Sequence, residues 1–348
     1  MVAGSLLRQE IVEQPGVLER LIQSQRGPAD ELARAMKARD VTHVVIAARG
    51  TSDNAGRYAQ YVLGAKNGLV VALATPSLFT VYQQPPRLRN ALVLGISQSG
   101  KSPDLSAVLT EGKGQGALTA VMTNAPQSDL AGLGDVVFDL GAGLEKAVAA
   151  TKTYTAELGA IALLSATLAG SQEMQTALEG VPNAVAQALD TEPAAAEAAG
   201  RLRGIQYAAV IGRGFNYSTA FELALKLKEL SYTSTEPYSS ADFLHGPLAM
   251  VEKGYPVIVL AASGALLADM QAILSILRER QAEVLCIGDD PATAAMARGS
   301  LTIPRLVPEW LSPLPLIVPG QLLSMHLAAL RGYDVDAPRS IRKVTETF

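Results

Sequence analysis

The 348-residue chain has few cysteines, few aromatic residues and no excess of positive charge. Its single cysteine, Cys286, excludes an intramolecular disulfide framework and a cysteine-based zinc cluster. Aromatic residues make up only 5%, so the core must pack mainly with Ala, Leu, Val and Ile. The 29 Lys and Arg residues are outnumbered by 33 Asp and Glu residues, and no basic stripe is visible. This composition disfavours a protein that binds nucleic acid.

The chain also lacks an uninterrupted hydrophobic run long enough to span a membrane. Two stretches without formal charge, 67–86 and 310–330, are long enough, but each contains several prolines and polar residues. At the N-terminus, Arg8, Glu10 and Glu13 interrupt any apolar core of a signal peptide. We therefore expect a soluble, cytoplasmic protein without a membrane partner.

What the chain does contain is an internal repeat with an offset of 164 residues. The apolar run 43–48 ends in Arg49-Gly50, and the run 207–212 ends in Arg213-Gly214. Second apolar runs, 91–96 and 256–261, precede Ser99-Gly100 and Ser263-Gly264, and a third pair at 118–122 and 284–287 follows with one residue of slippage. Short apolar runs alternating with helical patterns indicate a parallel sheet. The repeat predicts an α/β protein with two similar domains, each a parallel β-sheet flanked by helices in three layers.

We place the boundaries of this organisation by composition. Residues 1–30 are expected to form an N-terminal helical segment, 31–180 the first domain, 195–335 the second domain and 336–348 a polar tail. The alanine-rich stretch between about residues 180 and 200 is expected to connect the two domains. Its composition predicts helix rather than a flexible linker.

A hydroxyl-rich loop, 97–102, follows the second apolar run directly. Ser102 suits the N-cap of a helix that begins at Pro103. The free backbone N–H groups and the dipole of such a helix start favour an anion, and ligands of open α/β sheets bind at the carboxyl ends of the strands. An ordinary capped helix gives the same pattern. A second turn of similar chemistry, 49–54, shifts the balance toward phosphate binding.

The glycine turns do not carry the sequence motifs of nucleotide-binding loops. Neither has the glycine spacing of a Walker loop, and Tyr217 stands where a dinucleotide fingerprint beginning at Gly212 would need its third glycine. The sequence therefore disfavours a nicotinamide enzyme.

The helical pattern 217–230 places Glu222, Lys226 and Glu229 on one face. From this helix alone, a solvated charged face is the favoured interpretation. The pattern follows a glycine turn, however, so its first turns face the strand ends where ligands bind. His245 lies in a loop stiffened by Gly246 and Pro247, which suits a positioned acid–base group. A carboxylate and an imidazole near a phosphate loop can move protons on a phosphorylated sugar.

Several separate motifs give the chain a specific resemblance. They are 50–52 (Gly-Thr-Ser), 97–100 (Ser-Gln-Ser-Gly), 145–152 (ending Val-Ala-Ala-Thr-Lys), 224–232, 245–249 (His-Gly-Pro-Leu-Ala) and 334–339 followed by Lys343. In this order they resemble the double sugar-isomerase (SIS) domain family, and nearly the whole chain is similar to the isomerase half of glucosamine-6-phosphate synthase. The resemblance implies two tandem SIS domains.

The resemblance also implies roles for individual residues. Glu229 matches the carboxylate that carries a proton between C1 and C2, and Lys226 matches a supporting charged group. His245 matches a histidine that opens the sugar ring from the neighbouring subunit of a homodimer, and Lys343 matches a lysine that can form a Schiff base. The implied substrate contacts are Gly50, Thr51, Ser52, Ser97, Gln98, Ser99, Ser102, Val148, Ala150 and Glu222. No metal or organic cofactor is implied.

Three differences from the synthase pattern point to another reaction. Arg49 replaces a cysteine, Lys101 replaces an acidic residue and Ala150 replaces a serine, and no N-terminal cysteine nucleophile is present. In these features the chain resembles stand-alone glucosamine-6-phosphate deaminases more closely. We therefore expect glucosamine 6-phosphate to be converted to fructose 6-phosphate and ammonia.

Four alternatives to this reaction remain. They are action on galactosamine 6-phosphate, a deglycase for fructosamine phosphates, an aminotransferase-like synthase activity that uses free ammonia or a borrowed glutaminase, and a non-catalytic sugar-phosphate sensor. A sensor would be expected to carry a DNA-binding helix-turn-helix and to lack the set Glu229, His245 and Lys343. Neither feature is seen in the sequence.

Overall fold

The computed structural model describes residues 2–343, which divide into two compact units. Unit 2 contains 16–145, 152–179 and 342–343, and unit 1 contains 2–15, 146–151 and 180–341. The long first helix, α1 (Leu6–Ser24), contributes its first ten residues to unit 1 and the rest to unit 2.

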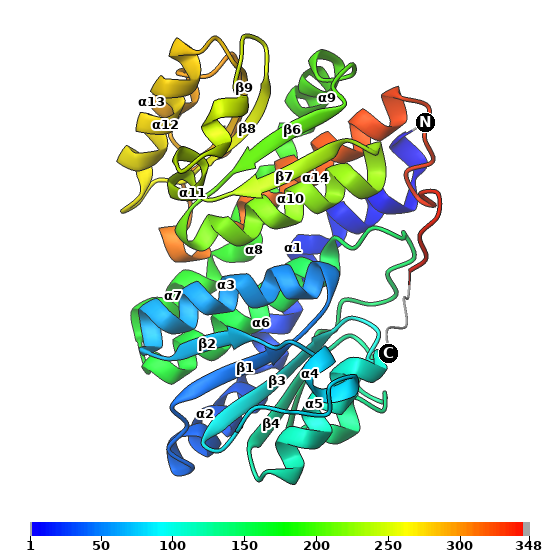
Figure 1. The fold of residues 1–348 in the computed structure, drawn as a ribbon, viewed down its shortest axis with the longest axis vertical. Coiled ribbons are helices and arrows are strands. Elements are labelled where there is room, and N and C mark those ends of the chain that lie inside the picture. Colours follow the sequence, from blue (N-terminus) through cyan, green and yellow to red (C-terminus); the bar gives the residue numbers. More distant parts are fainter. Residues whose placement is uncertain (1, 344–348) are drawn as a thin grey trace. The chain divides into compact units, whose positions relative to one another are not determined.

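Unit 2 is built around a parallel five-stranded sheet with the order β2-β1-β3-β4-β5 (Figure 1). Its strands are β1 (His43–Ala47), β2 (Val70–Leu73), β3 (Ala91–Ser97), β4 (Leu118–Thr123) and β5 (Val136–Asp139). Its helices are α2 (Arg26–Ala38), α3 (Gly50–Asn67), α4 (Ser77–Thr80), α5 (Pro103–Gly114), α6 (Lys152–Ala169) and α7 (Gln172–Glu179).

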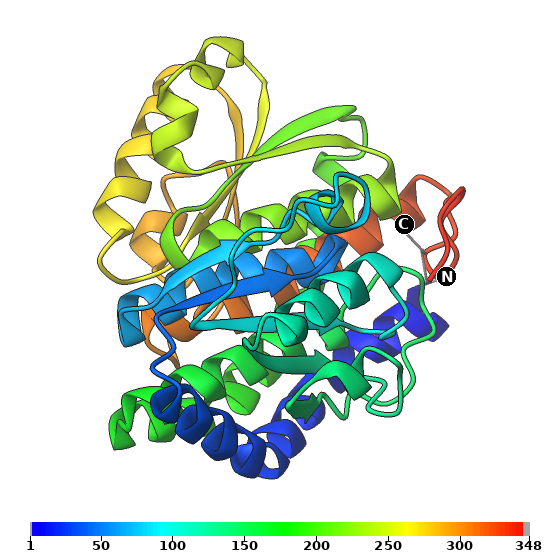
Figure 2. The same ribbon diagram turned by 60° about the horizontal axis from the view of Figure 1, so that its bottom comes forward.

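Helices cover both faces of this sheet, as the turned view in Figure 2 shows. On one face, Gly56 of α3 packs so closely on Ile46 of β1 that a Cβ at Gly56 would lie 3.3 Å from the Ile46 side chain. On the other face, a Cβ at Gly112 of α5 would lie 2.7 Å from Val93 of β3. Side chains alternate along a strand, so these two contacts lie on opposite faces. The expected three-layer arrangement is confirmed.

Unit 1 repeats the architecture with the sheet order β10-β9-β8-β6-β7, again parallel throughout. Its strands are β6 (Tyr207–Ile211), β7 (Ser234–Tyr238), β8 (Pro256–Ala261), β9 (Glu283–Gly288) and β10 (Gly299–Thr302). Its helices are α8 (Val181–Ala188), α9 (Glu192–Arg201), α10 (Tyr217–Ser231), α11 (Ser240–Leu244), α12 (Leu267–Glu279), α13 (Pro291–Ala294) and α14 (Pro313–Leu330).

The strand register confirms the internal repeat in detail. Val45 of β1 pairs with Val93 of β3, and Ala209 of β6 pairs with Val257 of β8, an offset of 164 residues in both strands. The one-residue slippage in the third run is also confirmed, because β4 corresponds to β9 with an offset of 165. The two turns of unit 2 proposed to bind phosphate therefore have defined counterparts in unit 1.

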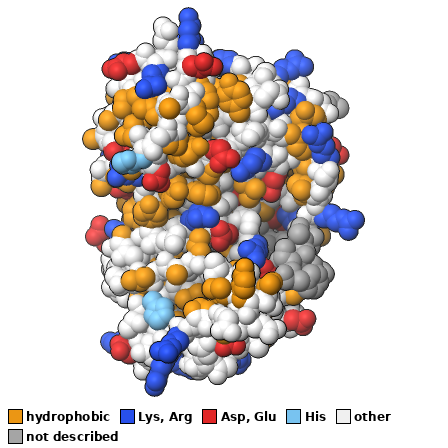
Figure 3. Space-filling model, in the orientation of Figure 1, with side chains coloured by type: hydrophobic (Ala, Val, Ile, Leu, Met, Phe, Trp, Pro, Cys, Tyr) orange, Lys and Arg blue, Asp and Glu red, His pale blue; other side chains and the backbone are white. Residues whose placement is uncertain are grey.

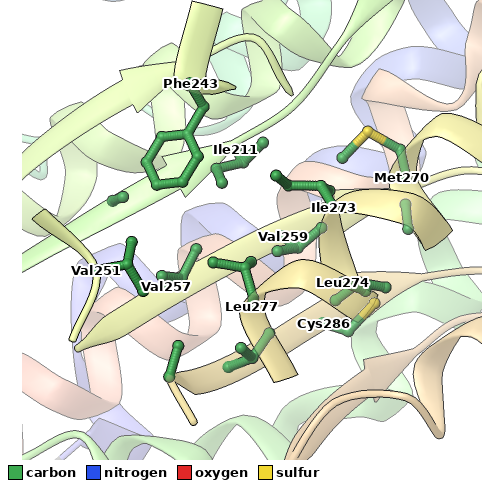
Figure 4. Close-up of a cluster of buried hydrophobic side chains, with 14 residues drawn as sticks. Ile211, Phe243, Val251, Val257, Val259, Met270, Ile273, Leu274, Leu277 and Cys286 are labelled. Carbon is green, nitrogen blue, oxygen red and sulfur yellow. The ribbon is translucent and has the colours of Figure 1, made fainter. Parts of the chain in front are cut away.

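One hydrophobic core cluster of unit 1 lies between α12 and the sheet, as Figure 4 shows. Leu274 and Leu277 of α12 pack over Val257, Val259 and Cys286 of the strands. Burial raises the pKa of the Cys286 thiol to about 12, so this cysteine behaves as a core residue rather than a nucleophile.

One helix of unit 1, α14, has the length and hydropathy of a membrane span. However, 83% of its 18-residue window is buried inside the protein. Gly320 of α14 packs against Leu223 of α10, where a Cβ would come within 2.9 Å of the Leu223 side chain. This is the environment of a core helix, and the same covering shapes the site on α10 described below.

Candidate functional site

The loop 97–102 of unit 2 occupies the place where open α/β sheets bind ligands. It leaves the carboxyl end of β3, beside the turn at 48–50 that leaves β1. The strand order reverses between β1 and β3, because β1 leads on to β2 at one side while β3 leads on to β4 at the other. Such a switch point opens a crevice outside the strand ends.

The backbone of this loop is shaped around glycine. Gly100 has a positive φ of 63°, and a Cβ there would overlap the Ser128 hydroxyl at 2.0 Å. The Gly100 N–H donates to the Ser97 hydroxyl at 3.1 Å. Ser102 is the N-cap of α5, as predicted, but its side chain makes no capping hydrogen bond to the helix. The Leu105 N–H, in the first turn of α5, donates to the Asp104 carboxylate at 2.9 Å. A helix N-terminus with hydroxyls nearby is suited to an anion.

The remaining loop residues differ in exposure. Gln98 and Ser99 are half-buried beside buried Ser97, whereas Lys101 is exposed. The loop therefore leaves Gln98 and Ser99 partly accessible to a ligand, and Lys101 is exposed to solvent.

The neighbouring turn is tied to the same helix start by an ion pair. Arg49, the N-cap of α3, donates to Asp104 of α5 through Nε and a terminal nitrogen, each at 2.8 Å. Gly50, with φ of 55°, begins α3, and Thr51 follows at half burial. Ser52 is buried and donates to the Glu157 carboxylate at 2.7 Å. Ser52 thus faces α6 within unit 2.

The counterpart loop in unit 1 is filled by the protein's own carboxylates. Asp289 accepts from the Ser263 N–H at 2.6 Å, and Glu309 accepts from the Ala265 N–H at 2.8 Å. The Glu309 side chain lies so close that a Cβ at Gly264 would come within 2.3 Å of it. The Arg–Asp pair is repeated here between Arg213 and Asp269 at 2.7 Å. The repeat therefore retains its framework, but this second loop already holds two negative charges.

Helix α10 carries a compact charged cluster, the α10 triad of Glu222, Lys226 and Glu229. The Lys226 ammonium lies 3.3 Å from Glu222 and 2.6 Å from Glu229. Burial alone would lower the pKa of Lys226, but the two carboxylates outweigh it and raise the pKa. The lysine is therefore held as a cation.

The solvated face favoured for this helix by its sequence is wrong. The Lys226 and Glu222 side chains are 1% and 0% exposed, and α14 is among the elements that pack against α10. Glu229 is 24% exposed, so it is the one member of the triad with substantial access to solvent. A buried cation fixing a partly exposed carboxylate is an arrangement suited to a positioned general base.

His245 lies at the end of the short helix α11 and is exposed. Its backbone N–H donates to the Asp242 carbonyl at 3.1 Å, and Ser239 caps the start of the helix. Gly246 follows with a φ of 142°, a conformation that side chains rarely adopt. The turn thus fixes the backbone at His245 while its imidazole faces outward from unit 1.

In unit 2, Lys343 pairs with a buried carboxylate, Glu145, to which the sequence alone assigns no role. Its ammonium lies 2.6 Å from Glu145, whose side chain is 0% exposed. Glu145 also accepts from the N–H and the hydroxyl of Thr153 at 3.1 and 2.7 Å. Glu145 lies in a loop without periodicity, and its position at the start of the 145–152 motif was the available signal. Val148 and Ala150, the implied substrate contacts of that loop, belong to unit 1 and are half-buried.

Charges elsewhere are dispersed. On the face shown in Figure 3, basic and acidic side chains are interspersed without a large patch of one sign among the described residues. Within residues 2–343, no group of three or more His, Cys, Asp or Glu side chains is placed to hold a metal ion.

Comparisons with known proteins identify the family of the chain. The model of the SIS domain matches residues 37–166 and 202–331. A glutamine--fructose-6-phosphate aminotransferase (isomerizing) from Gloeobacter violaceus is 36% identical over 96% of this chain, which spans 57% of that protein. The structure of a candidate phosphosugar isomerase from Silicibacter pomeroyi DSS-3 is 34% identical, with a TM-score of 0.86 over 95% of this chain and 100% of that one.

The expected nearer likeness to deaminases is not supported. The glucosamine-6-phosphate deaminase of Thermotoga maritima is 22% identical, with a TM-score of 0.80 over 99% of this chain and 100% of that one, which shows a shared fold alone. The expectation rested on a few loop positions such as Arg49 and Lys101, whereas identity averages over the whole chain. The two SIS matches cover most of both repeats, and the chain belongs to the SIS domain family as a double-SIS protein.

Proposed function

We propose that this chain converts glucosamine 6-phosphate to fructose 6-phosphate and ammonia, as a homodimer. The observation that carries the proposal is the α10 triad, in which buried Lys226 fixes partly exposed Glu229. Moving hydrogen between adjacent carbons needs one base that serves both carbons in turn, and a carboxylate held by a fixed cation can do this.

The steps follow from the chemistry of the substrate. His245 assists ring opening, and its outward position supports a contribution to the site of a neighbouring subunit. Glu229 takes the proton from C2 and returns it at C1, which converts the amino aldose to a fructosimine. Water hydrolyses the C=N bond of the fructosimine, which releases ammonia and leaves the ketone. We assign the phosphate to the loop 97–102.

Lys343 offers a second route for the last step. Its amine would attack C2 of the fructosimine, displace ammonia and form a Schiff base that water then hydrolyses. Glu145, 2.6 Å from the Lys343 ammonium, is the group positioned to accept its proton. This proton must leave before the nitrogen can act as a nucleophile.

A synthase-like reaction in the opposite direction is the second candidate. It is favoured by the 36% identity to an aminotransferase that this chain spans only in part. We favour release of ammonia because the chain differs from the synthase pattern at Arg49 and Lys101, in the two turns proposed to bind phosphate, and at Ala150, a proposed substrate contact. The names of the relatives do not decide between these two directions.

A substrate panel tests the proposal. Purified protein is incubated in EDTA with glucosamine 6-phosphate, galactosamine 6-phosphate and a fructosamine phosphate, and ammonia is measured, with glutamine as a control. We expect ammonia from glucosamine 6-phosphate at the highest kcat/KM. A preference for another panel member would reassign the substrate. Glutamine hydrolysis, or a requirement for metal, would contradict the proposal.

A further inference from the structure

The loop 146–151 carries two proposed substrate contacts but has no regular secondary structure of its own. Ala147 and Ala149 are buried, whereas Val148 and Ala150 between and beside them keep partial exposure. The loop thus presents alternate residues on its accessible side. Its backbone N–H groups lack the partners that a helix or sheet would provide, so other parts of the chain must satisfy them.

A buried carboxylate near the start of α1 accepts hydrogen bonds from two of these N–H groups. Glu10 is 4% exposed and accepts from the Lys146 N–H through Oε1. The Ala147 N–H lies 3.3 Å from each oxygen of the same carboxylate. Hydrogen bonds to an ionised acceptor are stronger than those between neutral groups, so Glu10 fixes the first two residues of the loop firmly.

The C-terminal segment supplies the next bond. The Val148 N–H donates to the backbone carbonyl of Asp336 at 3.1 Å. The Asp336 carboxylate in turn accepts from the N–H groups of Leu6 and Leu7 at 3.0 and 2.9 Å. These are free N–H groups of the first turn of α1, where the helix dipole favours a negative charge.

These bonds close a ring within unit 1, from the start of α1 to the loop, from the loop to the tail, and from the tail back to α1. We propose that Glu10 and Asp336 are positioning residues that set the backbone of the loop 146–151 for substrate binding. The part that concerns substrate rests on the proposed function and on the family resemblance, which implies that Val148 and Ala150 contact the sugar phosphate. Neither carboxylate is assigned to the chemistry itself.

The ring also explains the acidic tail motif 334–339, to which the sequence alone gave no role. After Asp336 the tail is held again at Arg339, whose guanidinium stacks on the Tyr232 ring at 4.1 Å and whose N–H donates to the Tyr232 hydroxyl at 2.8 Å. The segment that leads to Lys343 is therefore anchored at two points within unit 1.

The test compares Glu10→Gln with Glu19→Gln, which removes a charge from an exposed position of the same helix. Hydrogen–deuterium exchange of peptides covering 144–152 measures how firmly the loop is held. Steady-state kinetics with the substrate preferred by the wild type measure the consequence. We expect faster exchange and about a ten-fold rise in KM, with a smaller change in kcat, for Glu10→Gln alone.

A second variant, Asp336→Asn, tests the proposal even if Glu10→Gln fails to fold. Asp336→Asn should also speed exchange in the loop and raise KM. The Glu10→Gln/Asp336→Asn double variant should show less than the sum of the two free-energy changes, because both act on one ring. Unchanged exchange in both single variants, or faster exchange with wild-type KM, would overturn the proposal. The activity of the wild type on the substrate panel tests the proposed function separately, and the exchange data do not depend on it.

Discussion

Neutralising Glu229 should mainly lower kcat, whereas neutralising Glu222, the other carboxylate of the α10 triad, should mainly lower the free energy of unfolding. Glu229→Gln keeps the side-chain shape and removes the base, so kcat should fall by about 10²–10⁴-fold. Its effect on folding should stay below about 1 kcal/mol, because Glu229 is partly exposed and Lys226 keeps Glu222 as its partner.

Glu222→Gln should lower folding stability more, and kcat less, than Glu229→Gln does. Breaking a fully buried ion pair costs about 3–5 kcal/mol, and we expect the lower end because Lys226 retains Glu229. The remaining base is intact, so kcat should fall less than in Glu229→Gln. Lys228→Gln, at an exposed position of the same helix, is the matched control and should change neither quantity.

Two assays separate these effects. Initial rates of ammonia release give kcat and KM, and urea unfolding followed by circular dichroism gives the change in folding free energy. A Glu229→Gln variant with wild-type kcat would refute the assignment of the base, and Glu222 would be the next candidate. A Glu222→Gln variant as stable as Glu229→Gln would refute the argument from burial.

Three further predictions concern the other groups. Ser99→Ala should raise KM about ten-fold or more, because it removes a hydrogen bond to the charged phosphate. Calorimetry should find one phosphate site per wild-type chain, since Asp289 and Glu309 fill the second loop, and two sites would contradict this. Borohydride added during turnover should trap a sugar adduct on the wild type but not on Lys343→Ala, and trapping in the variant would place the Schiff base elsewhere. A hydrogen bond from Arg8 is the main cause that holds the pKa of Glu192 below its ordinary value. The stability that Glu192 contributes is therefore present above about pH 4.3 and is lost as the pH falls through the lowered pKa. Glu192→Gln should be less stable than the wild type at pH 7 and equal to it in strong acid.

Much of the fold could be predicted from the sequence because its signals are local. Apolar runs that end in glycine turns located β1, β3, β6 and β8, and the offset of 164 residues predicted the repeated register. Pro103 correctly marked the first residue of α5. Each of these features depends on residues adjacent in the chain.

The site was less predictable because its contacts join distant segments. Periodicity places Glu222 and Lys226 on one face of α10, but it cannot show that α14, which begins at Pro313, packs against the helix. The pairing of Glu145 with Lys343 spans 198 residues, and Glu309 reaches Ala265 across 44. The role of Lys343 came from the family resemblance alone.

Exchange of carbon-bound hydrogen is the most direct test of proton transfer by Glu229. Glucosamine 6-phosphate is incubated with enzyme in D₂O, and the sugar C–H signals are followed by ¹H NMR. Because the proton held on the Glu229 carboxyl exchanges with D₂O before it is returned to carbon, the account predicts that wild-type enzyme forms fructose 6-phosphate that carries deuterium at C1 and exchanges the C2 hydrogen of the remaining substrate. Glu229→Gln should do neither. Full exchange by Glu229→Gln, or ammonia release by the wild type without loss of the C2 hydrogen, would contradict it.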